Sequence, residues 1–548
     1  MKTLLILILS FGFFGLSFGQ EYHFVQFSGK DTTGFDSPTE FLSAKSLARR
    51  SRQGIELNER DYPVNQNYLD SITATGAELV YATKWLNGAL VLAFEEQLSV
   101  ILKKDFVRRN TPIIQLYGGT RVQEIAESCP AKEYASSKSQ VEMLGADSLH
   151  GLGYAGNGIS IAVFDDGFLN VDKISAFNFL MQNHLGGTYN IVNPESDVFS
   201  SGNRSHGTVV LSAMAAYLEN EIVGTAYDAD YYLFITENSA EESPVEELNW
   251  LVAAEKADSL GIDIINSSLG YYDFDDVNLA LSYSDLDGDK AIITQAADFA
   301  ASTGMLVVTS AGNEGAISWQ KIIAPADADS VLAVGAVAPD GNKMSFSSEG
   351  PTADGRIKPN VMAQGGSVAV VNSNGNITKS SGTSFSTPIM AGFVACLWQA
   401  YPNLTNMELI DKLQKSGDLA DQANNLYGYG IPDFGRFASL AGSPSVDNAY
   451  CNSELPTSLI TESLNQITIF PNPILDNKIQ ISFPKELLGQ ELQISLVDLV
   501  GKTYSQENVL VQQAIESLEI RTRKLESGIY ILTIITGTQE KTFRVLVE

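Results

Sequence analysis

The run Ile159-Ser160-Ile161-Ala162-Val163-Phe164 is almost entirely apolar and ends in Asp165-Asp166-Gly167. An apolar run of this length, closed by polar residues and a glycine, is typical of a strand that is buried on both faces. Further short apolar runs follow at 262–266, 305–308 and 331–337, with helix-like stretches between them. Strands that alternate with helices in this way predict an α/β domain whose parallel sheet is covered by helices on both faces.

One of the helices between these strands carries clear start and stop signals. Ser243 is a candidate N-cap, Pro244 suits the first helical position, and Gly261 closes the pattern. A second helix is expected at 292–302. The alternation of strands and helices continues to about residue 442, so this middle part of the chain is predicted to form one domain.

The amino-acid composition limits the classes of function that the protein can have. The chain has 548 residues, enough for two to four domains of the usual size. Acidic residues outnumber basic ones 65 to 35, and the net charge of −30 disfavours nucleic acid as a partner, because nonspecific binding needs a positive surface. With four histidines, three cysteines and no CxxC or HExxH pair, the sequence offers little from which to build a zinc site.

The two ends of the chain differ from the middle. Residues 1–19 combine Lys2, an apolar run and small residues before a cut after Gly19, which predicts a secretory signal peptide. The alternative, a membrane anchor, needs about 20 apolar residues, and this run is shorter. Residues 20–120 are then expected to form a βαββαβ unit, a small antiparallel sheet with two helices. Its strands and helices are predicted at 22–27, 66–75, 79–81, 89–94, 95–104 and 106–116.

The C-terminal part reads as a separate unit. Residues 443–463 are polar and helix-poor, as in a linker. Residues 464–548 contain short strand-like runs with turn signals and no convincing helix, which predicts a small β-sandwich. The expected strands lie at 467–470, 479–481, 492–499, 518–521, 529–535 and 543–547.

Three polar side chains in the middle domain are placed for chemistry. Asp165 follows a buried strand, His206 begins an apolar helix in Ser205-His206-Gly207-Thr208, and Ser384 lies at the head of another helix in Ser381-Gly382-Thr383-Ser384. Because ligands of open α/β sheets bind at the carboxyl ends of the strands, all three side chains could meet at one edge. Taken singly, the aspartate could be a turn residue and the serine an N-cap.

The combination of residue types explains what such a site could do. A serine hydroxyl becomes a good nucleophile when an imidazole takes its proton, and a buried carboxylate fixes the tautomer of that imidazole. Asn313, in Ser310-Ala311-Gly312-Asn313, is neutral and can donate a hydrogen bond to an oxyanion without losing a proton. These residues together indicate nucleophilic catalysis.

The order Asp, His, Asn, Ser with these flanking residues resembles the subtilisin-like serine proteases, or subtilases, over residues 134–442. Two more motifs, Asn266-Ser267-Ser268-Leu269-Gly270 and Phe346-Ser347-Ser348-Glu349-Gly350-Pro351, fit the same family. The resemblance implies a secreted serine endopeptidase with a peptidase domain at 121–442 that acts on protein or peptide substrates and needs no cofactor for its chemistry. It assigns Ser384 as nucleophile, His206 as general base, Asp165 as its orienting partner and Asn313 as oxyanion donor.

The resemblance also implies where the substrate binds. Ser268, Leu269 and Gly270 on one side, and Ala311 and Gly312 on the other, should form backbone-rich walls against which an extended peptide pairs as an added strand.

The sequence departs from the common subtilase pattern in a few places. Asp166 stands where Ser or Thr is usual, although an Asp-Asp-Gly form also occurs in the kexin branch. Val209 replaces a frequent His, and Phe385 and Ser386 replace the usual Met and Ala. None of these changes removes a catalytic group, but a second carboxylate beside Asp165 leaves the pH dependence open.

The flanking segments resemble two further families. Residues 20–120 are similar to the inhibitory propeptides of subtilases, which implies a self-processing preproprotein, inhibited by its own propeptide and cut between about 111 and 128. The C-terminal part resembles type IX sorting domains through Phe470-Pro471-Asn472-Pro473, Val497-Asp498-Leu499-Val500-Gly501 and Ser527-Gly528-Ile529-Tyr530. This implies the type IX secretion machinery as a partner and a secreted or outer-surface location.

Several alternatives stay open at this point. Asp285, Asp287 and Asp289 alternate as calcium ligands do, but no glutamate closes an EF-hand loop, so a solvated acidic loop is the alternative. In an exported chain we expect a Cys129–Cys451 bridge and a free, buried Cys396, with three free thiols as the alternative. The competing function is a catalytically inactive surface adhesin built on a subtilase scaffold.

Overall fold

The computed structural model describes residues 20–32, 35, 37–113, 134–200, 204–238 and 242–445, together with seven strands of the C-terminal part. The chain divides into two compact units, of which the larger comprises Met1–Phe177 and Leu185–Ala449. The predicted signal peptide and most of the predicted linker lie outside the described residues. None of the helices in the described part combines the length and hydropathy that a membrane span requires.

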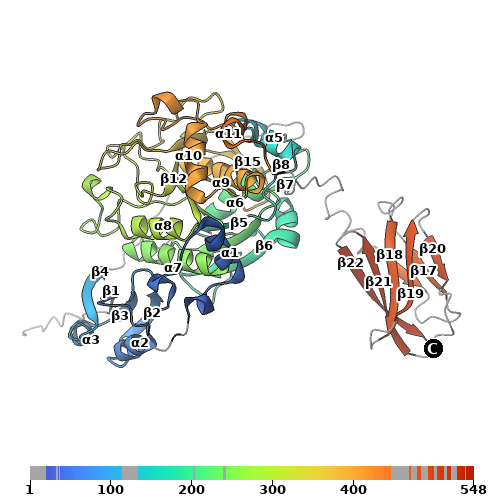
Figure 1. Cartoon of the computed structure of the whole chain (residues 1–548), viewed down its shortest axis with the longest axis horizontal. Coiled ribbons are helices and arrows are strands. Elements are labelled where there is room, and N and C mark those ends of the chain that lie inside the picture. The colour runs from blue at the N-terminus through green and yellow to red at the C-terminus, as the bar shows by residue number, and fades with distance from the viewer. Residues whose placement is uncertain are drawn as a thin grey trace, which may run out of the picture. The chain divides into compact units, whose positions relative to one another are not determined.

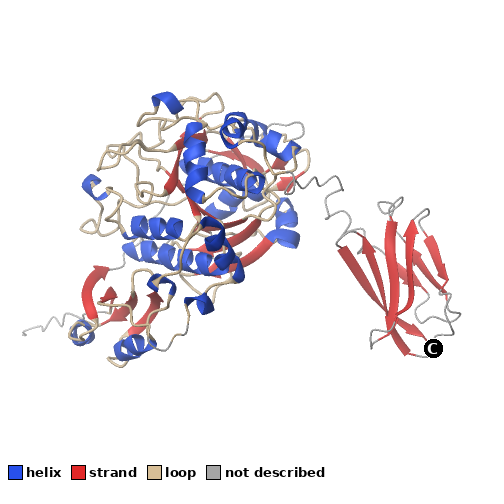
Figure 2. Ribbon diagram, in the orientation of Figure 1, coloured by secondary structure: helices blue, strands red, loops and turns tan. Residues whose placement is uncertain are grey.

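A seven-stranded sheet forms the centre of the larger unit (Figures 1 and 2), with strand order β13-β12-β11-β10-β5-β9-β6. All neighbouring strands of this sheet are parallel. Helices α7 and α8 cover one face and α6 and α9 the other. The predicted fold class, a parallel sheet covered on both faces, is therefore confirmed. The strands are β5 Ser160–Asp165, β6 Leu185–Asn190, β9 Asp230–Ile235, β10 Ile264–Ser267, β11 Leu306–Ser310, β12 Val331–Val337 and β13 Val361–Gln364.

Four helices cover the two faces of the sheet. They are α6 His206–Ala215, α7 Pro244–Leu260, α8 Ile292–Ser302 and α9 Thr383–Ala400. Helix α7 starts with the predicted proline behind Ser243 and ends at Gly261, whose φ of 84° is left-handed and suits glycine. The other described α-helices and β-strands of this domain are α4 Lys138–Glu142, α5 Ala146–Gly151, β7 Tyr217–Leu218, β8 Ile222–Val223, β14 Val368–Val371, β15 Ile377–Ser380, α10 Asn406–Lys415 and α11 Phe434–Ala441.

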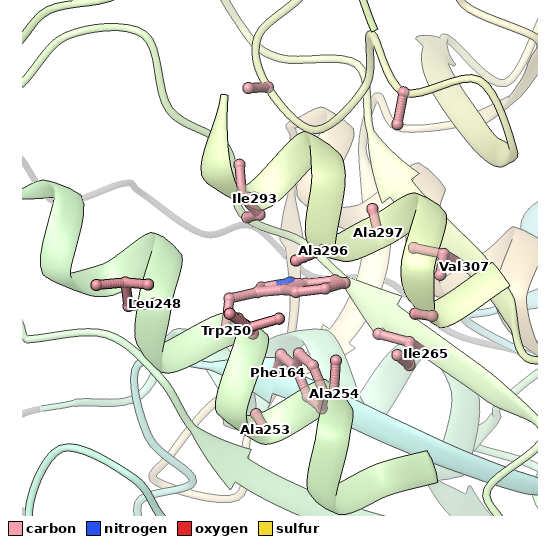
Figure 3. Packing of buried hydrophobic residues seen from close by; sticks show 14 of the residues in the cluster. Phe164, Leu248, Trp250, Ala253, Ala254, Ile265, Ile293, Ala296, Ala297 and Val307 are labelled. Carbon is pink, nitrogen blue, oxygen red and sulfur yellow. The ribbon is translucent and has the colours of Figure 1, made fainter. Parts of the chain in front are cut away.

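Trp250 of α7 anchors the packing between the helices and the sheet (Figure 3). Its indole lies between the Ala296 and Ala297 side of α8 and the ring of Phe164 in β5, which meets it edge-on at 5.3 Å. Its Nε1 donates to Oγ of Ser267 at 3.0 Å, so the buried indole keeps its hydrogen bond. This contact holds the end of β10, and therefore the start of the predicted substrate wall, against α7.

The N-terminal segment forms an antiparallel sheet of order β2-β3-β1-β4. The predicted βαββαβ elements are present, but the structure adds a helix, α1, between β1 and α2. Apart from its first residue, Ala44, its sequence AKSLARRSRQ contains only two apolar residues, Leu47 and Ala48. The hydrophobic periodicity of the sequence therefore did not reveal this helix. The elements are β1 Glu21–Phe27, α1 Ala44–Gln53, α2 Gln66–Thr73, β2 Glu78–Thr83, β3 Gly88–Ala93, α3 Glu95–Ile101 and β4 Val107–Ile113.

This N-terminal sheet shares a core with the central domain. Phe24, Trp85 and Leu90 are buried in the same apolar cluster as residues of α7 and α8. The Trp85 ring meets Phe299 of α8 at 6.3 Å. The segment therefore packs on the α7–α8 face through apolar side chains.

The C-terminal unit is described through its strands. They form two antiparallel sheets, ordered β16-β17-β20 and β19-β18-β21-β22. Residues 503–510, which we did not expect to be a strand, pair with β18 as β19. The strands are β16 Thr468–Phe470, β17 Lys478–Ser482, β18 Glu491–Asp498, β19 Thr503–Leu510, β20 Ile515–Glu519, β21 Gly528–Thr536 and β22 Gln539–Val547.

Candidate active site

Asp165 and His206 are in direct contact at the carboxyl edge of the central sheet. Asp165 is the last residue of β5 and is fully buried, and its Oδ1 lies 2.8 Å from Nδ1 of His206, the first residue of α6. The backbone N–H of Asp166 donates to the same oxygen at 2.8 Å. The carboxylate is thus held in place by the backbone and can fix the tautomer of the imidazole.

The glycine after the histidine is required by close packing. A Cβ placed on Gly207 would lie 2.6 Å from the carbonyl oxygen of Gly167 and 2.9 Å from Cβ of Asp165. Thr208 then ties the helix to the same loop, since its Oγ1 donates to the carbonyl of Leu169 at 3.0 Å. The start of α6 can therefore approach the end of β5 closely enough for the imidazole to reach the carboxylate.

Ser384 lies at the neighbouring strand end. It is the second residue of α9 and half-buried. Oγ of Ser268, just after β10, donates to the carbonyl of Ser384 at 3.0 Å, and Oγ of Ser384 lies 3.4 Å from the carbonyl of Ser268. The ring of Phe385, the next residue, is 6.1 Å from the His206 ring. The predicted nucleophile, base and orienting carboxylate therefore come from elements that converge on one edge.

Asn313 is anchored through its side-chain oxygen. The backbone N–H and the hydroxyl of Thr383 donate to Oδ1 of Asn313 at 2.8 and 3.0 Å. Because both of these contacts use the oxygen, the amide has its NH2 group to offer to a bound molecule. Asn313 is exposed and lies beside the residue that precedes Ser384, which is the place that an oxyanion donor needs.

The two predicted substrate walls follow neighbouring strands. Ser268, Leu269 and Gly270 come directly after β10, and Ala311 and Gly312 after β11, its partner in the sheet. Oγ of Ser310 donates to the carbonyl of Leu269 at 3.0 Å and links the two walls.

The side chain of Ile323 fills the space between these walls. A Cβ placed on Gly270 would lie 2.5 Å from Cδ1 of Ile323, and a Cβ placed on Gly312 would lie 3.0 Å from its Cγ1. Ile323 is only 7% exposed. The sequence analysis did not single out this residue, because nothing local marks an isoleucine as facing a cleft.

The second carboxylate, Asp166, has an altered acidity. Burial raises the pKa of Asp166 to about 6, and the negative charge of Asp165 adds to this, while His206 opposes it. The backbone N–H of Gly207 donates to its Oδ1 at 3.3 Å. Asp166 therefore changes charge in the pH range in which an imidazole also titrates.

The sequence analysis did not identify two buried glutamates, Glu237 and Glu246, as a pair of neighbouring acids. Burial raises the pKa of Glu237 to about 8 and that of Glu246 to about 10, and neighbouring carboxylates add to both shifts. The hydroxyl of Tyr271 donates to Glu237 at 2.6 Å, and the N–H of Asn238 donates to Glu246 at 2.7 Å. Burial and mutual repulsion thus favour the protonated forms of this pair, which reduces the negative charge near the catalytic edge.

The predicted calcium ligands do not fit a metal ion in this arrangement. Asp285 forms an ion pair with Lys290 and accepts hydrogen bonds from Ser282, whereas Asp287 accepts from the backbone N–H groups of Asp289 and Lys290. Among the residues that the structure describes, no three His, Cys, Asp or Glu side chains form a group that could hold a metal ion.

Cys396 is free and buried in α9, as predicted, and its Sγ lies 3.1 Å from the carbonyl of Thr225. Burial raises the pKa of this thiol, so it stays protonated and unreactive. The predicted partners Cys129 and Cys451 both lie outside the described residues.

Comparison with known proteins bears on each of the three segments. A model of the subtilase family matches residues 156–430, a model of the peptidase S8 propeptide domain of Bacteroidota matches 22–128, and a model of the secretion system C-terminal sorting domain matches 468–548.

Individual relatives extend this result. Subtilisin E from Bacillus subtilis (strain 168) is 30% identical over 366 residues, which cover 66% of this chain and 82% of the relative. Subtilisin DY from Bacillus licheniformis is 30% identical over 295 residues, which cover 53% of this chain and 94% of the relative. An alkaline protease from Alkalihalobacillus alcalophilus is 27% identical over 358 residues, covering 62% of this chain and 82% of the relative.

Proposed function

Because the chain belongs to the subtilase family, we propose that it is a serine endopeptidase that hydrolyses peptide bonds with Ser384, His206 and Asp165. The observation that carries this proposal is the 2.8 Å contact between Asp165 and His206 at the sheet edge where Ser384 also lies. The chain also has a family propeptide domain, and its C-terminal sorting domain directs it by type IX secretion to the cell surface or the extracellular space.

The proposed reaction follows from the contacts at this edge. With Nδ1 of His206 donating to Asp165, Nε2 can accept the proton of Ser384 Oγ as that oxygen attacks the substrate carbonyl carbon. The negative charge that develops on the carbonyl oxygen is stabilised by the amide of Asn313 and the backbone N–H of Ser384. His206 then gives its proton to the leaving amine, and water releases the acyl group from Ser384 by the same steps in reverse.

Peptide-library cleavage by the processed protein tests this function directly. We expect cleavage of internal peptide bonds, with the same preference in every batch of purified protein. An inactive adhesin built on the same fold would leave the library intact at every protein concentration and pH.

Self-processing is part of the proposal. It is supported by the propeptide match at 22–128 and by the position of β4, which ends at Ile113. We expect the mature N-terminus between about 111 and 128, most of which lies outside the described residues. N-terminal sequencing that finds a start before β4, which would leave most of the β1–β4 sheet attached, would contradict this expectation.

Asn313→Ala is expected to lower kcat by roughly 10²–10³-fold with little change in KM, because the amide acts on charge that exists only in the transition state. That magnitude is the one measured for the corresponding loss in subtilisin. Asn313→Asp keeps the anchored oxygen but loses the donor, so it should be as impaired as the alanine variant. A raised KM with unchanged kcat in both variants would remove Asn313 from the oxyanion role.

Ile323 should make the enzyme favour small side chains next to the scissile carbonyl, because it occupies the space between the two walls. In Ile323→Gly we expect the ratio of kcat/KM for phenylalanine over alanine at this substrate position to rise by about 10²-fold. Ile323→Ala should give an intermediate ratio, and the melting temperature of each variant shows whether folding is affected. An unchanged ratio in folded Ile323→Gly protein would exclude Ile323 from the substrate pocket.

A further inference from the structure

Helix α1, the helix that periodicity did not predict, buries two consecutive arginines against the protease domain. Arg49 is 1% exposed and Arg50 2% exposed, and α1 lies beside α7 (Figure 1). A buried guanidinium is tolerated only when it is paired and hydrogen-bonded. The partners of these two side chains therefore show what the helix recognises.

Arg49 binds the carboxyl ends of two core helices. Its Nη2 donates to Oδ1 of Asp258 in α7 at 2.6 Å, and its Nε donates to the carbonyl of Thr303, just after α8, at 3.1 Å. Its Nη1 donates to the carbonyl of Ile262, the second residue after α7. Carbonyl groups at helix ends lack partners within the helix and carry partial negative charge, which suits a guanidinium.

Arg50 binds the same carboxylate from the other side. Its Nη1 lies 2.7 Å from Oδ1 of Asp258 and its Nη2 lies 3.0 Å from Oδ2, a forked contact with both oxygens. Asp61 of the N-terminal segment neutralises the second guanidinium at 2.7 Å. Lys84 adds a third cation at 3.2 Å from Asp258. Burial opposes the charge, but these partners still lower the pKa of Asp258.

A second core carboxylate, one turn earlier on α7, is satisfied in the same way. Glu255 accepts hydrogen bonds from Oγ1 of Thr83 at 2.5 Å and from the N–H groups of Lys84 and Trp85 at 3.0 and 2.9 Å. These donors, like those around Asp258, all belong to the N-terminal segment. The core therefore carries two buried acids that are compensated by the propeptide.

The residues that Arg49 and Arg50 contact lie at the edge of the sheet opposite the catalytic residues. Ile262 and Thr303 precede β10 and β11, whereas Ser268 and Asn313 follow the same two strands. The strands put about 20 Å between the two regions, at roughly 3.3 Å per residue. Cutting the chain after β4 leaves every contact of Arg49 and Arg50 in place.

We propose that the protease core has an arginine-binding site, formed by Asp258 and the carbonyl ends of α7 and α8, and that Arg49 and Arg50 in this site hold the propeptide on the core after the chain is cut. Its ligand class is a pair of adjacent guanidinium groups on a helix. The inhibitory consequence rests on the proposed peptidase function, because a retained propeptide keeps inhibiting only if there is activity to inhibit. The binding itself does not depend on Ser384.

The test uses the full chain with Ser384→Ala, which removes any dependence on its own activity. A recognition sequence for an unrelated endopeptidase is inserted between residues 113 and 134, and the folded protein is cut there. The dissociation constant of the severed segment is then measured by its retention on the tagged core. In Arg49→Ala/Arg50→Ala we expect this constant to rise by about 10²-fold or more, because a buried carboxylate loses its partners.

Arg52→Ala is the matched control. Arg52 lies on the same helix, but its side chain is 38% exposed and its nitrogen is 3.6 Å from Asp263, so we expect a change of less than about 3-fold. Asp258→Ala in the core should weaken binding as much as the arginine variant, and combining the two should add little. Equal retention of the segment in the control and in the double arginine variant would overturn the proposal.

If the arginine variant does not fold, chemical modification of the cut, otherwise unmutated complex decides instead. With phenylglyoxal and mass spectrometry, we expect Arg52 to react while Arg49 and Arg50 are protected until the segment dissociates. Equal reaction of all three arginines in the intact complex would also overturn the proposal. Neither the retention experiment nor the chemical modification depends on peptidase turnover. Both results can therefore be interpreted even if the protein is not a peptidase.

Discussion

Ser384→Ala is expected to lower kcat for peptide hydrolysis by about 10⁶-fold, the loss measured when subtilisin loses its nucleophile. The change removes a single oxygen that lies 3.4 Å from the carbonyl of Ser268, so the fold should be retained. The measurement is kcat in purified, processed protein together with labelling by a covalent serine-hydrolase probe. The unmutated protein should be labelled and the variant should not.

Ser386→Ala is the matched control for this experiment. Ser386 lies in the same helix, but it is buried and its Oγ donates to the carbonyl of Thr383 at 3.0 Å. Its loss should cost some stability and leave probe labelling intact. Full turnover in Ser384→Ala would disprove the assignment of the nucleophile, whereas an unlabelled, inactive unmutated protein would favour the adhesin alternative.

Asp165→Asn is expected to lower kcat by about 10⁴-fold at neutral pH. An asparagine of the same shape can donate its NH2 to Nδ1 of His206, which then carries its proton on Nε2 and cannot act as a base toward Ser384. Oδ2 of Asp165 is buried without a hydrogen-bond partner among the described residues, but Oδ1 also accepts from the N–H of Asp166, so an NH2 group in its place loses that contact as well. The pH profile of kcat/KM measures the effect.

Asp166→Asn separates the role of Asp165 from that of its neighbour. Since the pKa of Asp166 is raised to about 6, its carboxylate is charged above that pH and stabilises a protonated His206. Removing this charge should move the acid limb of the profile to lower pH and leave the plateau within about 10-fold of the original. If Asp165→Asn and Asp166→Asn have equal plateaus, Asp165 is not the orienting carboxylate.

Local signals in the sequence predicted part of the secondary structure of the central domain, including four of the seven strands of its sheet, whereas β6, β9 and β13 were not predicted. The strand at 331–337 and the helix at 292–302 have the predicted bounds, and α7 begins and ends at the predicted proline and glycine. Apolar runs, caps and helix breakers act on neighbouring residues, so they can be read without the fold. The same holds for the catalytic edge, because carboxyl ends of adjacent parallel strands must meet.

Contacts between residues that are distant in the sequence decided the features that local sequence patterns do not predict. Helix α1 has few apolar residues and is capped locally by Ser43 and Gly54, but its place on the core depends on Arg49 and Arg50 meeting Asp258, more than 200 positions away in the chain. Ile323 lies against Gly270 and Gly312, which are distant from it in the sequence, only because the fold brings these segments together. The acidity of Glu246 likewise depends on burial, which no pattern of neighbours reveals.

The sequence by itself therefore determined the family, many of the elements and the candidates for catalysis, whereas the tertiary structure decided which partners Arg49 and Arg50 meet and that Ile323 lies between Gly270 and Gly312. The physical reason is the range of the interactions. Hydrophobic periodicity and capping operate within one or two turns or strands. The pairing of a buried charge and the filling of a cleft depend on side chains that only the folded chain brings together.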